Sequence, residues 1–210
     1  MASISDVKLT QDQRDALQEV ANIGMGQAGA ALADVLDTMV TLSVPRIQVL
    51  DVSGLAEALA AMVGGSQEVT AVRQSFWCDI RGEAIVVYGR AGCKDLWDLM
   101  GYDQGDQSQD AAAERELLFD VANVLVGACF CSVFEQLGRS LSFSPPSLIA
   151  ANVPIESVLQ PSSLPWRAAL LVEVNFRLEN REFTCHLLML MPEDSIEQMK
   201  RALDHFLANL

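Results

Sequence analysis

The sequence predicts an α+β fold, with an antiparallel sheet, two long helices on one face of it, and a pseudo-twofold internal repeat. Two long stretches have apolar residues at helical spacing, and each is followed by shorter stretches that alternate as β-strands do. The succession of helix, strand, short helix, β-hairpin and helix occurs twice along the chain. Because hairpin strands pair antiparallel and long helices must cover a sheet face, we expect two fused half-domains around one core.

The 210 residues are enough for one domain with a well-buried core. We expect a single domain over residues 1–210, made of two repeats, residues 8–101 and 110–208, with a linker at residues 102–109. Gly, Asp and Gln are frequent in the linker region, as is typical of connecting segments. Half of the residues are hydrophobic and only 20% are charged, so the chain is expected to be a packed globule.

The first long helix is expected to run from the capping-box pattern of Thr10 and Gln13 to about Leu36. Its packed face is predicted to contain Leu17, Val20, Gly24, Ala28, Ala31 and Val35. A second, polar face carries Asp12, Asp15, Glu19, Asn22 and Gly26. Glycine within a helix is unfavourable by roughly 1 kcal/mol against alanine, so a second helix or a partner should approach closely at Gly24, Gly26 and Gly29.

The other predicted elements of the first half are an edge strand at Val40–Val49 that contains Pro45, a short helix at Leu55–Met62, a hairpin of Val69–Trp77 and Glu83–Tyr88, and a brief helix at Lys94–Met100. The second half is predicted to contain a helix capped by Asp110 that runs to about Leu137, a strand at Ser142–Ala150 that contains Pro146, a hairpin of Ala168–Leu178 and Glu182–Met191, and a last helix at Ile196–Leu207.

The charge and the cysteines limit the partners and the compartment. A net charge of −14 repels nucleic acid and anionic lipid, so neither is an expected partner. We find no leader-like segment and no apolar run near the roughly 20 residues that span a bilayer. The five cysteines are an odd number without metal-ligand spacing, which favours buried, reduced thiols and a cytoplasmic protein.

A short polar motif occurs twice at symmetric positions. Glu19 and Asn22 lie one helical turn apart, and Pro45 follows 22 residues after the asparagine. Asp120, Asn123 and Pro146 repeat this pattern, each 101 residues after its counterpart. An acid and an amide on a helix usually form an ordinary solvated face. Because asparagine is a poor residue inside a helix, its retention in both copies on a polar face indicates a function.

The paired motif resembles the E-x-x-N-x(22)-P signature of the CheC/CheX/FliY phosphatases of bacterial chemotaxis, and the flanking segments Ala21–Gly26 and Ser144–Pro146 are also in the style of that family. Two motifs in one chain are most like CheC, whereas one is expected in CheX. The resemblance covers nearly the whole chain. It implies a CheC-like domain that hydrolyses the aspartyl phosphate of a CheY-type response regulator, in chemotaxis or related two-component signalling.

The resemblance also implies the roles of the site residues. Asn22 and Asn123 are expected to hold the attacking water, while Glu19 and Asp120 pair with a lysine of the regulator. Pro45 and Pro146 are expected to support the site structurally. No cofactor of its own and no metal ligands are expected, because the regulator brings Mg²⁺. Aspartate is one methylene shorter than glutamate, so we expect the site at Asp120 and Asn123 to be the weaker one.

The alternative is a non-catalytic interaction module that binds a response regulator, a CheD-like deamidase or a flagellar switch protein. A CheD-like protein is a second expected partner in either case. His186 and His205 are far apart and have no companion motif, so a nucleophile triad is not expected. Trp77, Trp97 and Trp166 are interpreted as core or rim anchors.

Overall fold

The structure, a computed structural model, describes residues 8–63, 68–89, 107–159, 167–179 and 184–209. The first half of the chain contains α1 (Gln11–Leu36), β1 (Val40–Leu42), β2 (Arg46–Asp51), the 3₁₀ helix η2 (Val52–Gly54), α2 (Leu55–Val63), β3 (Glu68–Trp77) and β4 (Arg81–Gly89). The second half contains α4 (Gln107–Gln136), β5 (Ser142–Phe143), β6 (Ser147–Pro154), the 3₁₀ helix η3 (Ile155–Ser157), β7 (Ala168–Leu178), β8 (Thr184–Met191) and α5 (Glu193–Leu207).

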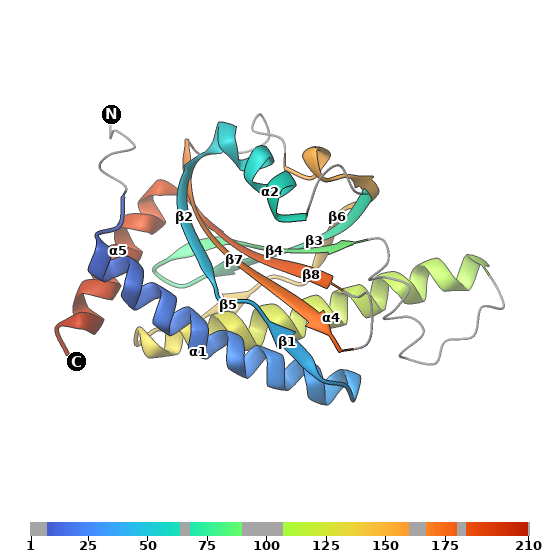
Figure 1. The fold of residues 1–210 in the computed structure, drawn as a ribbon, viewed down its shortest axis with the longest axis horizontal. Helices are drawn as coiled ribbons and strands as arrows, with labels where there is room; N and C mark the ends of the chain where they lie inside the picture. The colour runs from blue at the N-terminus through green and yellow to red at the C-terminus, as the bar shows by residue number, and fades with distance from the viewer. Residues whose placement is uncertain (1–7, 64–67, 90–106, 160–166, 180–183, 210) are drawn as a thin grey trace.

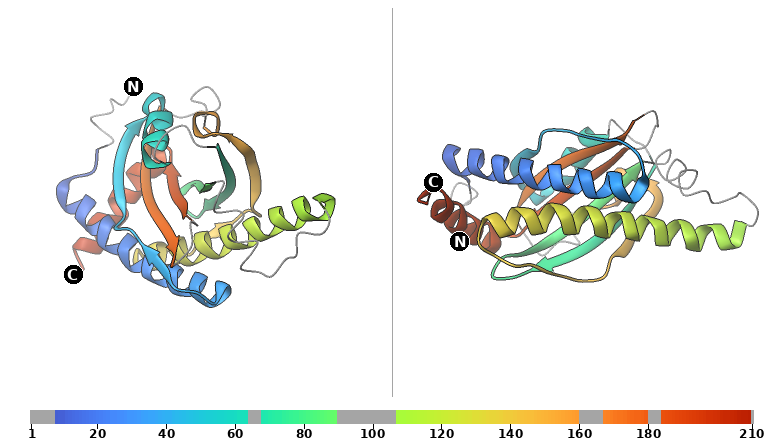
Figure 2. Two further views of the ribbon diagram at one scale, coloured as in Figure 1. Left: turned by 45° about the vertical axis from the view of Figure 1, so that its right-hand side comes forward. Right: turned by 90° about the horizontal axis from the view of Figure 1, so that it is seen from below.

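The strands form one curled antiparallel sheet in the order β1-β7-β8-β4-β3-β5, in which β2 also pairs with β7 and β6 also pairs with β3. The hairpins β3–β4 and β7–β8 meet at the centre, where β4 pairs with β8. Helices α1 and α4 lie side by side across one face of the sheet, and α2 lies over the other face (Figures 1 and 2). The predicted α+β fold with two long helices on one face is therefore confirmed.

The capping box predicted at the start of α1 is present. The backbone N–H of Gln13 donates to Thr10 Oγ1 at 3.2 Å, and the backbone N–H of Thr10 donates to Gln13 Oε1 at 3.0 Å. Gln13 Nε2 also donates to Asp204 Oδ1 of α5 at 2.7 Å. These bonds satisfy amide groups at the helix start and tie α1 to the last helix.

The two long helices run antiparallel and touch at Gly24 (Figure 2). A Cβ atom on Gly24 would lie 2.7 Å from the backbone oxygen of Cys129 and 3.0 Å from Val133 Cγ2. One residue further along α1, the sulfur atoms of Met25 and Cys129 are 3.2 Å apart. The predicted close approach is confirmed at Gly24, because only glycine leaves room for the second backbone.

The other two glycines of α1 differ in their surroundings. A Cβ atom on Gly29 would lie 2.8 Å from Leu42 Cδ1, so this glycine is also in a close contact. A Cβ atom on Gly26 would meet nothing within 4 Å, so no contact with a described residue requires glycine there.

Two hydrophobic cores fill the two sides of the sheet. The larger core lies between the sheet and the long helices, and its largest fully buried residues include Phe76, Tyr88, Phe130, Phe134 and Phe176. Phe76 meets Phe130 edge-on, with ring centroids 5.1 Å apart. The smaller core lies on the other face and includes Leu55 and Leu59 of α2 and Ile155 of η3. The sheet is therefore buried on both sides over much of its area.

Two details of the helix predictions are wrong. Val35 was expected on the packed face but is 47% exposed, while Leu32 and Leu36 are buried in its place. The buried face follows the four-residue steps from Gly24 through Ala28 to Leu32. Helix α4 begins at Gln107, so Asp110 lies inside it and does not cap it, and the helix takes up the end of the predicted linker at residues 102–109. The brief helix predicted at Lys94–Met100 lies outside the described residues.

One part of α4, Ala112–Gln136, is long and apolar enough to cross a membrane by length and composition, contrary to the expectation from the sequence. Most of this stretch is buried within the protein. Its apolar residues cover the sheet and α1, which explains the composition of the helix without a bilayer.

Candidate functional site

The two acid–asparagine pairs lie on the solvent-exposed faces of the long helices. Glu19 and Asn22 are exposed on α1, while Val20 and Ala21 between them are buried in the core. On α4, Asp120 and Asn123 are exposed, and the two residues between them, Val121 and Ala122, are buried. The buried residues fix the rotation of each helix, so the acid and the amide leave the same surface at a spacing of three residues.

The helix pair keeps the two sites apart. Gly24 of α1 packs at the level of Cys129 of α4, and the helices run in opposite directions. At a rise of about 1.5 Å per residue, Asn22 and Asn123 are therefore offset by roughly 12 Å along the helix axes. The structure thus brings each acid together with its own asparagine and gives two separate sites.

The surface around the first pair has features of a contact surface. Ile23, next to Asn22, is 43% exposed, so a large apolar side chain lies at the surface beside the motif. Gly26 follows Asn22 by one helical turn, and Gly127 occupies the corresponding place after Asn123. A Cβ atom would meet nothing within 4 Å at either glycine. The backbone of both helices is therefore accessible beside the asparagines.

The two signature prolines lie in matching turns at the sheet edges. Each predicted strand is split in two, and Pro45 and Pro146 end the gaps before β2 and β6. In the first gap Ser43 N donates to Asn175 O, and Asn175 N donates to Ser43 Oγ, both at 3.0 Å. In the second gap Ser144 and Ser75 exchange the same two bonds at the same distances. The edge position predicted for Pro45 is confirmed, and Pro146 also lies at a sheet edge. The support of the two sites by these prolines stays a prediction.

The residue that sequence reasoning missed is Gln74 of β3. Its Nε2 atom donates to Asn123 Oδ1 at 3.0 Å and to the backbone oxygen of Ser144 at 2.9 Å. The only sequence signal was a polar residue on the core-facing side of an apolar strand, between Val72 and Phe76. In the equivalent position beside the first site, β7 carries Val174, which is fully buried.

The histidine of β8 and the cysteines are not arranged for nucleophilic chemistry. His186 is buried beside Asn175, and burial together with the nearby Arg177 lowers its pKa to about 4. Burial raises the pKa of Cys129 and Cys185, so both thiols stay protonated near neutrality. Cys78 and Cys131 are half-buried and also have raised pKa values through burial. All four of these thiols are free, and Cys93 lies outside the described residues.

Trp77 is 46% exposed, which fits a rim position, while Trp97 and Trp166 lie outside the described residues. Among the residues that the structure describes, no three His, Cys, Asp or Glu side chains are grouped so that they could hold a metal ion.

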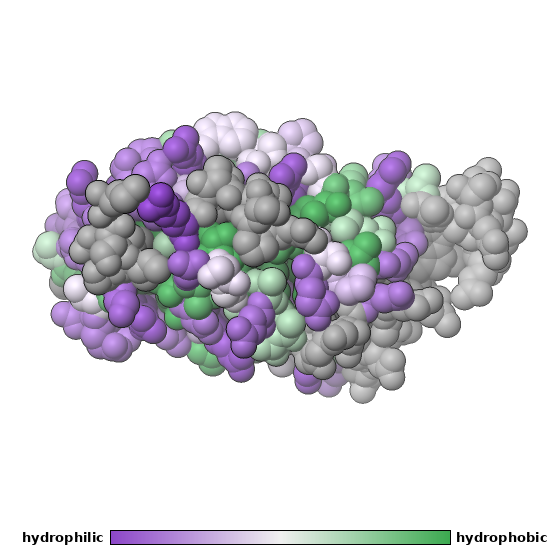
Figure 3. All heavy atoms as spheres, turned by 90° about the horizontal axis from the view of Figure 1, so that it is seen from above, coloured by the Kyte–Doolittle hydropathy of each residue, from purple (hydrophilic) through white to green (hydrophobic). Residues whose placement is uncertain are grey.

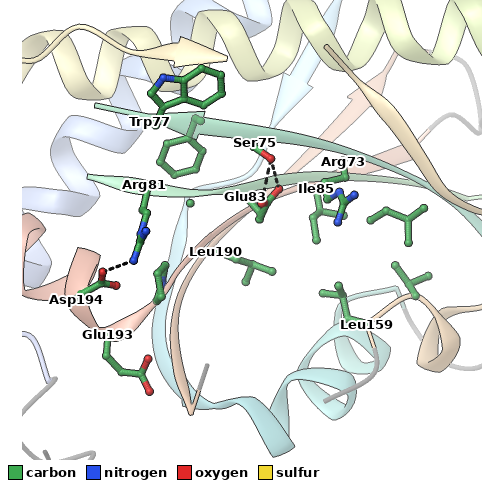
Figure 4. Close-up of a pocket in the computed structure, with 15 residues that line it drawn as sticks. Arg73, Ser75, Trp77, Arg81, Glu83, Ile85, Leu159, Leu190, Glu193 and Asp194 are labelled. Atoms are coloured by element: carbon green, nitrogen blue, oxygen red, sulfur yellow. Dashed lines mark hydrogen bonds and ion pairs between the residues drawn. The ribbon is translucent and has the colours of Figure 1, made fainter. Parts of the chain in front are cut away.

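A pocket of about 970 Å³ lies away from the motifs, between the other face of the sheet and the start of α5 (Figure 4). Arg81 pairs with Asp194 at 2.7 Å at one end of it, and Ser75 Oγ donates to Glu83 in its wall. On the face of the molecule seen in Figure 3, hydrophobic residues lie at the surface between hydrophilic ones. None of the four motif residues lines this pocket, and an exposed helix surface suits a protein substrate better than a pocket does.

Comparisons with known proteins find similar sequences and similar folds. The model of the CheC-like family matches residues 13–49, which include the first motif up to Pro45. The CheY-P phosphatase CheC of Bacillus subtilis (strain 168) is 24% identical over 203 residues, 93% of this chain and 95% of that protein. The flagellar motor switch phosphatase FliY of the same organism is 22% identical over 173 residues, 81% of this chain, and the matched region is only 43% of FliY.

Solved structures share the fold. FliY from Thermotoga maritima has a TM-score of 0.70 at 19% identity, with 94% of this chain and 98% of that chain covered. The CheX–CheY–BeF₃–Mg²⁺ complex from Borrelia burgdorferi has a TM-score of 0.54 at 14% identity, with 81% and 96% covered. The family model, the two relatives and the shared fold show that the chain is similar to the CheC/CheX/FliY proteins.

Proposed function

We propose that this chain is a protein aspartyl-phosphate phosphatase that acts on a CheY-type response regulator, in chemotaxis or related two-component signalling. The observation that carries the proposal is the pair of exposed acid–asparagine motifs on the two long helices. Neither asparagine stabilises its helix, and both are accessible to a partner. The names of two relatives, CheC and FliY of Bacillus subtilis, support the same reaction.

In the proposed reaction, Asn22 or Asn123 holds a water molecule in line with the phosphorus of the aspartyl phosphate. The water oxygen attacks phosphorus, and the bond from phosphorus to the aspartyl oxygen breaks. The products are inorganic phosphate, which takes the proton that the water loses, and the free carboxylate of the regulator. An acyl phosphate is already activated, so positioning and charge balance are sufficient catalytic devices. A neutral carboxamide provides the positioning without competing as a nucleophile.

Glu19 and Asp120 provide the docking register in this proposal. Each carboxylate lies one turn before its asparagine and pairs with a lysine at the active site of the regulator. Mg²⁺ belongs to the regulator, as part of the substrate, and neutralises charge on its phosphoryl group. The shorter Asp120 must bring the regulator closer to α4 to make the same ion pair, which weakens docking at the second site.

The proposed setting is the cytoplasm, where a response regulator is phosphorylated. A CheD-like protein is proposed as a second partner, with no role for nucleic acid or a membrane.

The decay of radiolabelled phospho-regulator tests the proposal. Asn22→Ala combined with Asn123→Ala should abolish the acceleration and leave the circular dichroism spectrum unchanged. Gln198→Ala, which removes an exposed amide from α5, is the matched control. With this variant the phospho-regulator should decay at the same rate as with the wild-type protein. An active double variant would refute the role of the asparagines.

A non-catalytic interaction module is the second candidate, favoured by the exposed Ile23 beside Asn22 and by the motor-switch role in the name of FliY. The same experiment separates the two. Binding of the regulator without any effect on its phosphate would support the interaction module and exclude the phosphatase.

A further inference from the structure

We propose that Gln74 is a positioning residue of the second site, which fixes the orientation of the Asn123 carboxamide. The proposal rests on the proposed phosphatase function and adds a residue that lies outside both motifs. Gln74 belongs to β3, on the sheet face that carries the long helices, and only 3% of it is exposed. It therefore acts from beneath α4 and does not touch the substrate.

The hydrogen bonds decide which way both amides point. The backbone oxygen of Ser144 can only accept a hydrogen bond, so the atom of Gln74 that lies 2.9 Å from it must be the donor Nε2. The same Nε2 lies 3.0 Å from Asn123, which must therefore present its acceptor Oδ1. The Nδ2 group of Asn123 is turned away from Gln74. One lone pair of Oδ1 remains free to accept a hydrogen bond from the attacking water.

Two observations separate this arrangement from ordinary core packing. Gln74 Oε1 is buried and has no hydrogen-bond partner within the described part of the chain, which an apolar residue at this position would avoid. The equivalent residue beside the first site is Val174, and the Asn22 carboxamide makes no hydrogen bond to any described residue. The fold therefore does not need a glutamine at this position, and within the described part of the chain Asn123 alone of the two asparagines is held by a hydrogen bond before the substrate arrives.

The two sites then differ in two separate ways. The shorter Asp120 weakens docking of the regulator at the second site, whereas Gln74 prepares Asn123 for the chemical step. Weaker docking of the regulator raises KM, whereas better orientation of the asparagine raises kcat. The second site should therefore have a higher KM than the first site and a kcat at least equal to that of the first.

Gln74→Met tests this proposal, because methionine has a similar length and shape but no donor. In the Asn22→Ala background, where only the second site acts, it should lower kcat by about three- to tenfold with KM unchanged. In the Asn123→Ala protein, where the first site still acts, Gln74→Met should leave kcat unchanged, since no carboxamide is left at the second site for it to orient. Gln136→Met is the matched control. Among the described residues, the amide that it removes from α4 bonds only to the backbone oxygens of Val20 and Ser132, and kcat should not change.

An unchanged kcat in the Asn22→Ala background, or an equal loss of kcat in the Asn123→Ala protein, would overturn the role of Gln74. If Gln74→Met unfolds the chain, Gln74→Leu replaces it. Side-chain amide signals of Asn123 in ¹⁵N NMR give a readout that needs no activity, because the carboxamide should become mobile in the variant. A rigid Asn123 in Gln74→Met would refute the proposal, whereas a wild-type protein that leaves the phospho-regulator unaffected would refute the phosphatase function itself.

Discussion

Two glycines of α1, two residues apart, should respond oppositely to alanine. At Gly24 the new Cβ would lie 2.7 Å from the Cys129 backbone oxygen, well inside van der Waals contact. A backbone atom cannot rotate away, so the long helices must separate, at a cost of about 3 kcal/mol. Alanine is about 1 kcal/mol more favourable than glycine inside a helix, so the free energy of unfolding should fall by a net amount of about 2 kcal/mol. At Gly26 nothing opposes the same gain, so the protein should become about 1 kcal/mol more stable.

Urea unfolding monitored by circular dichroism measures the difference between the two variants. A separation of about 3 kcal/mol, divided by a denaturant slope of about 2 kcal/mol/M, places their midpoints about 1.5 M apart. The slopes should match, since the unfolded states differ by one methyl group. Equal midpoints, or a Gly24→Ala midpoint above that of the wild type, would show that the helices do not meet at Gly24.

Two further predictions concern the docking acid and the buried histidine. Glu19→Ala should raise KM for the phospho-regulator more than Asp120→Ala, because the longer carboxylate makes the better ion pair; equal effects would contradict the asymmetry. The pKa of His186 is lowered to about 4 in the folded state, so the unfolded chain takes up this proton at a higher pH than the folded chain. The stability of the fold is therefore unaffected by His186 above pH 6.5 and decreases as the pH falls towards 4. Unfolding experiments should show about 2 kcal/mol lost from pH 7 to pH 5, at about 1.4 kcal/mol per pH unit. Burial raises the pKa of Glu173, which makes the fold more stable as the pH falls and so opposes the effect of His186. The test is therefore the difference in pH dependence between the wild type and His186→Gln, in which the loss due to His186 should disappear.

Local patterns were sufficient to predict the helices and the motif pairs. The capping box of Thr10 and Gln13 depends on four consecutive residues, and the exposure of Asn22 follows from the helical period. Gly24 was predictable as a close contact, because an unfavourable residue inside a helix indicates a neighbour. At Gly26 no described residue of the chain makes the close approach, so the other alternative, a docking partner, stays a prediction there.

The contact between Gln74 and Asn123 could not be predicted in this way. It joins residues that are 49 positions apart and depends on which residue of β3 faces α4. That register is set by the pairing of β3 with β4, β5 and β6, and a shift of one residue would turn Gln74 to the other face. The position of Val35 failed for a related reason, because a small error in the helical period accumulates towards the end of a long helix.

The turns that contain Pro45 and Pro146 have a further consequence for solubility. Free sheet edges are templates on which another chain can add a strand, and a long regular edge is the most dangerous. Here the outer strands are broken into short pieces, β1 and β2 on one side and β5 and β6 on the other, with a proline at the end of each break. Proline offers no N–H to an incoming strand. The same residues that mark the motif therefore protect the protein against edge-to-edge aggregation.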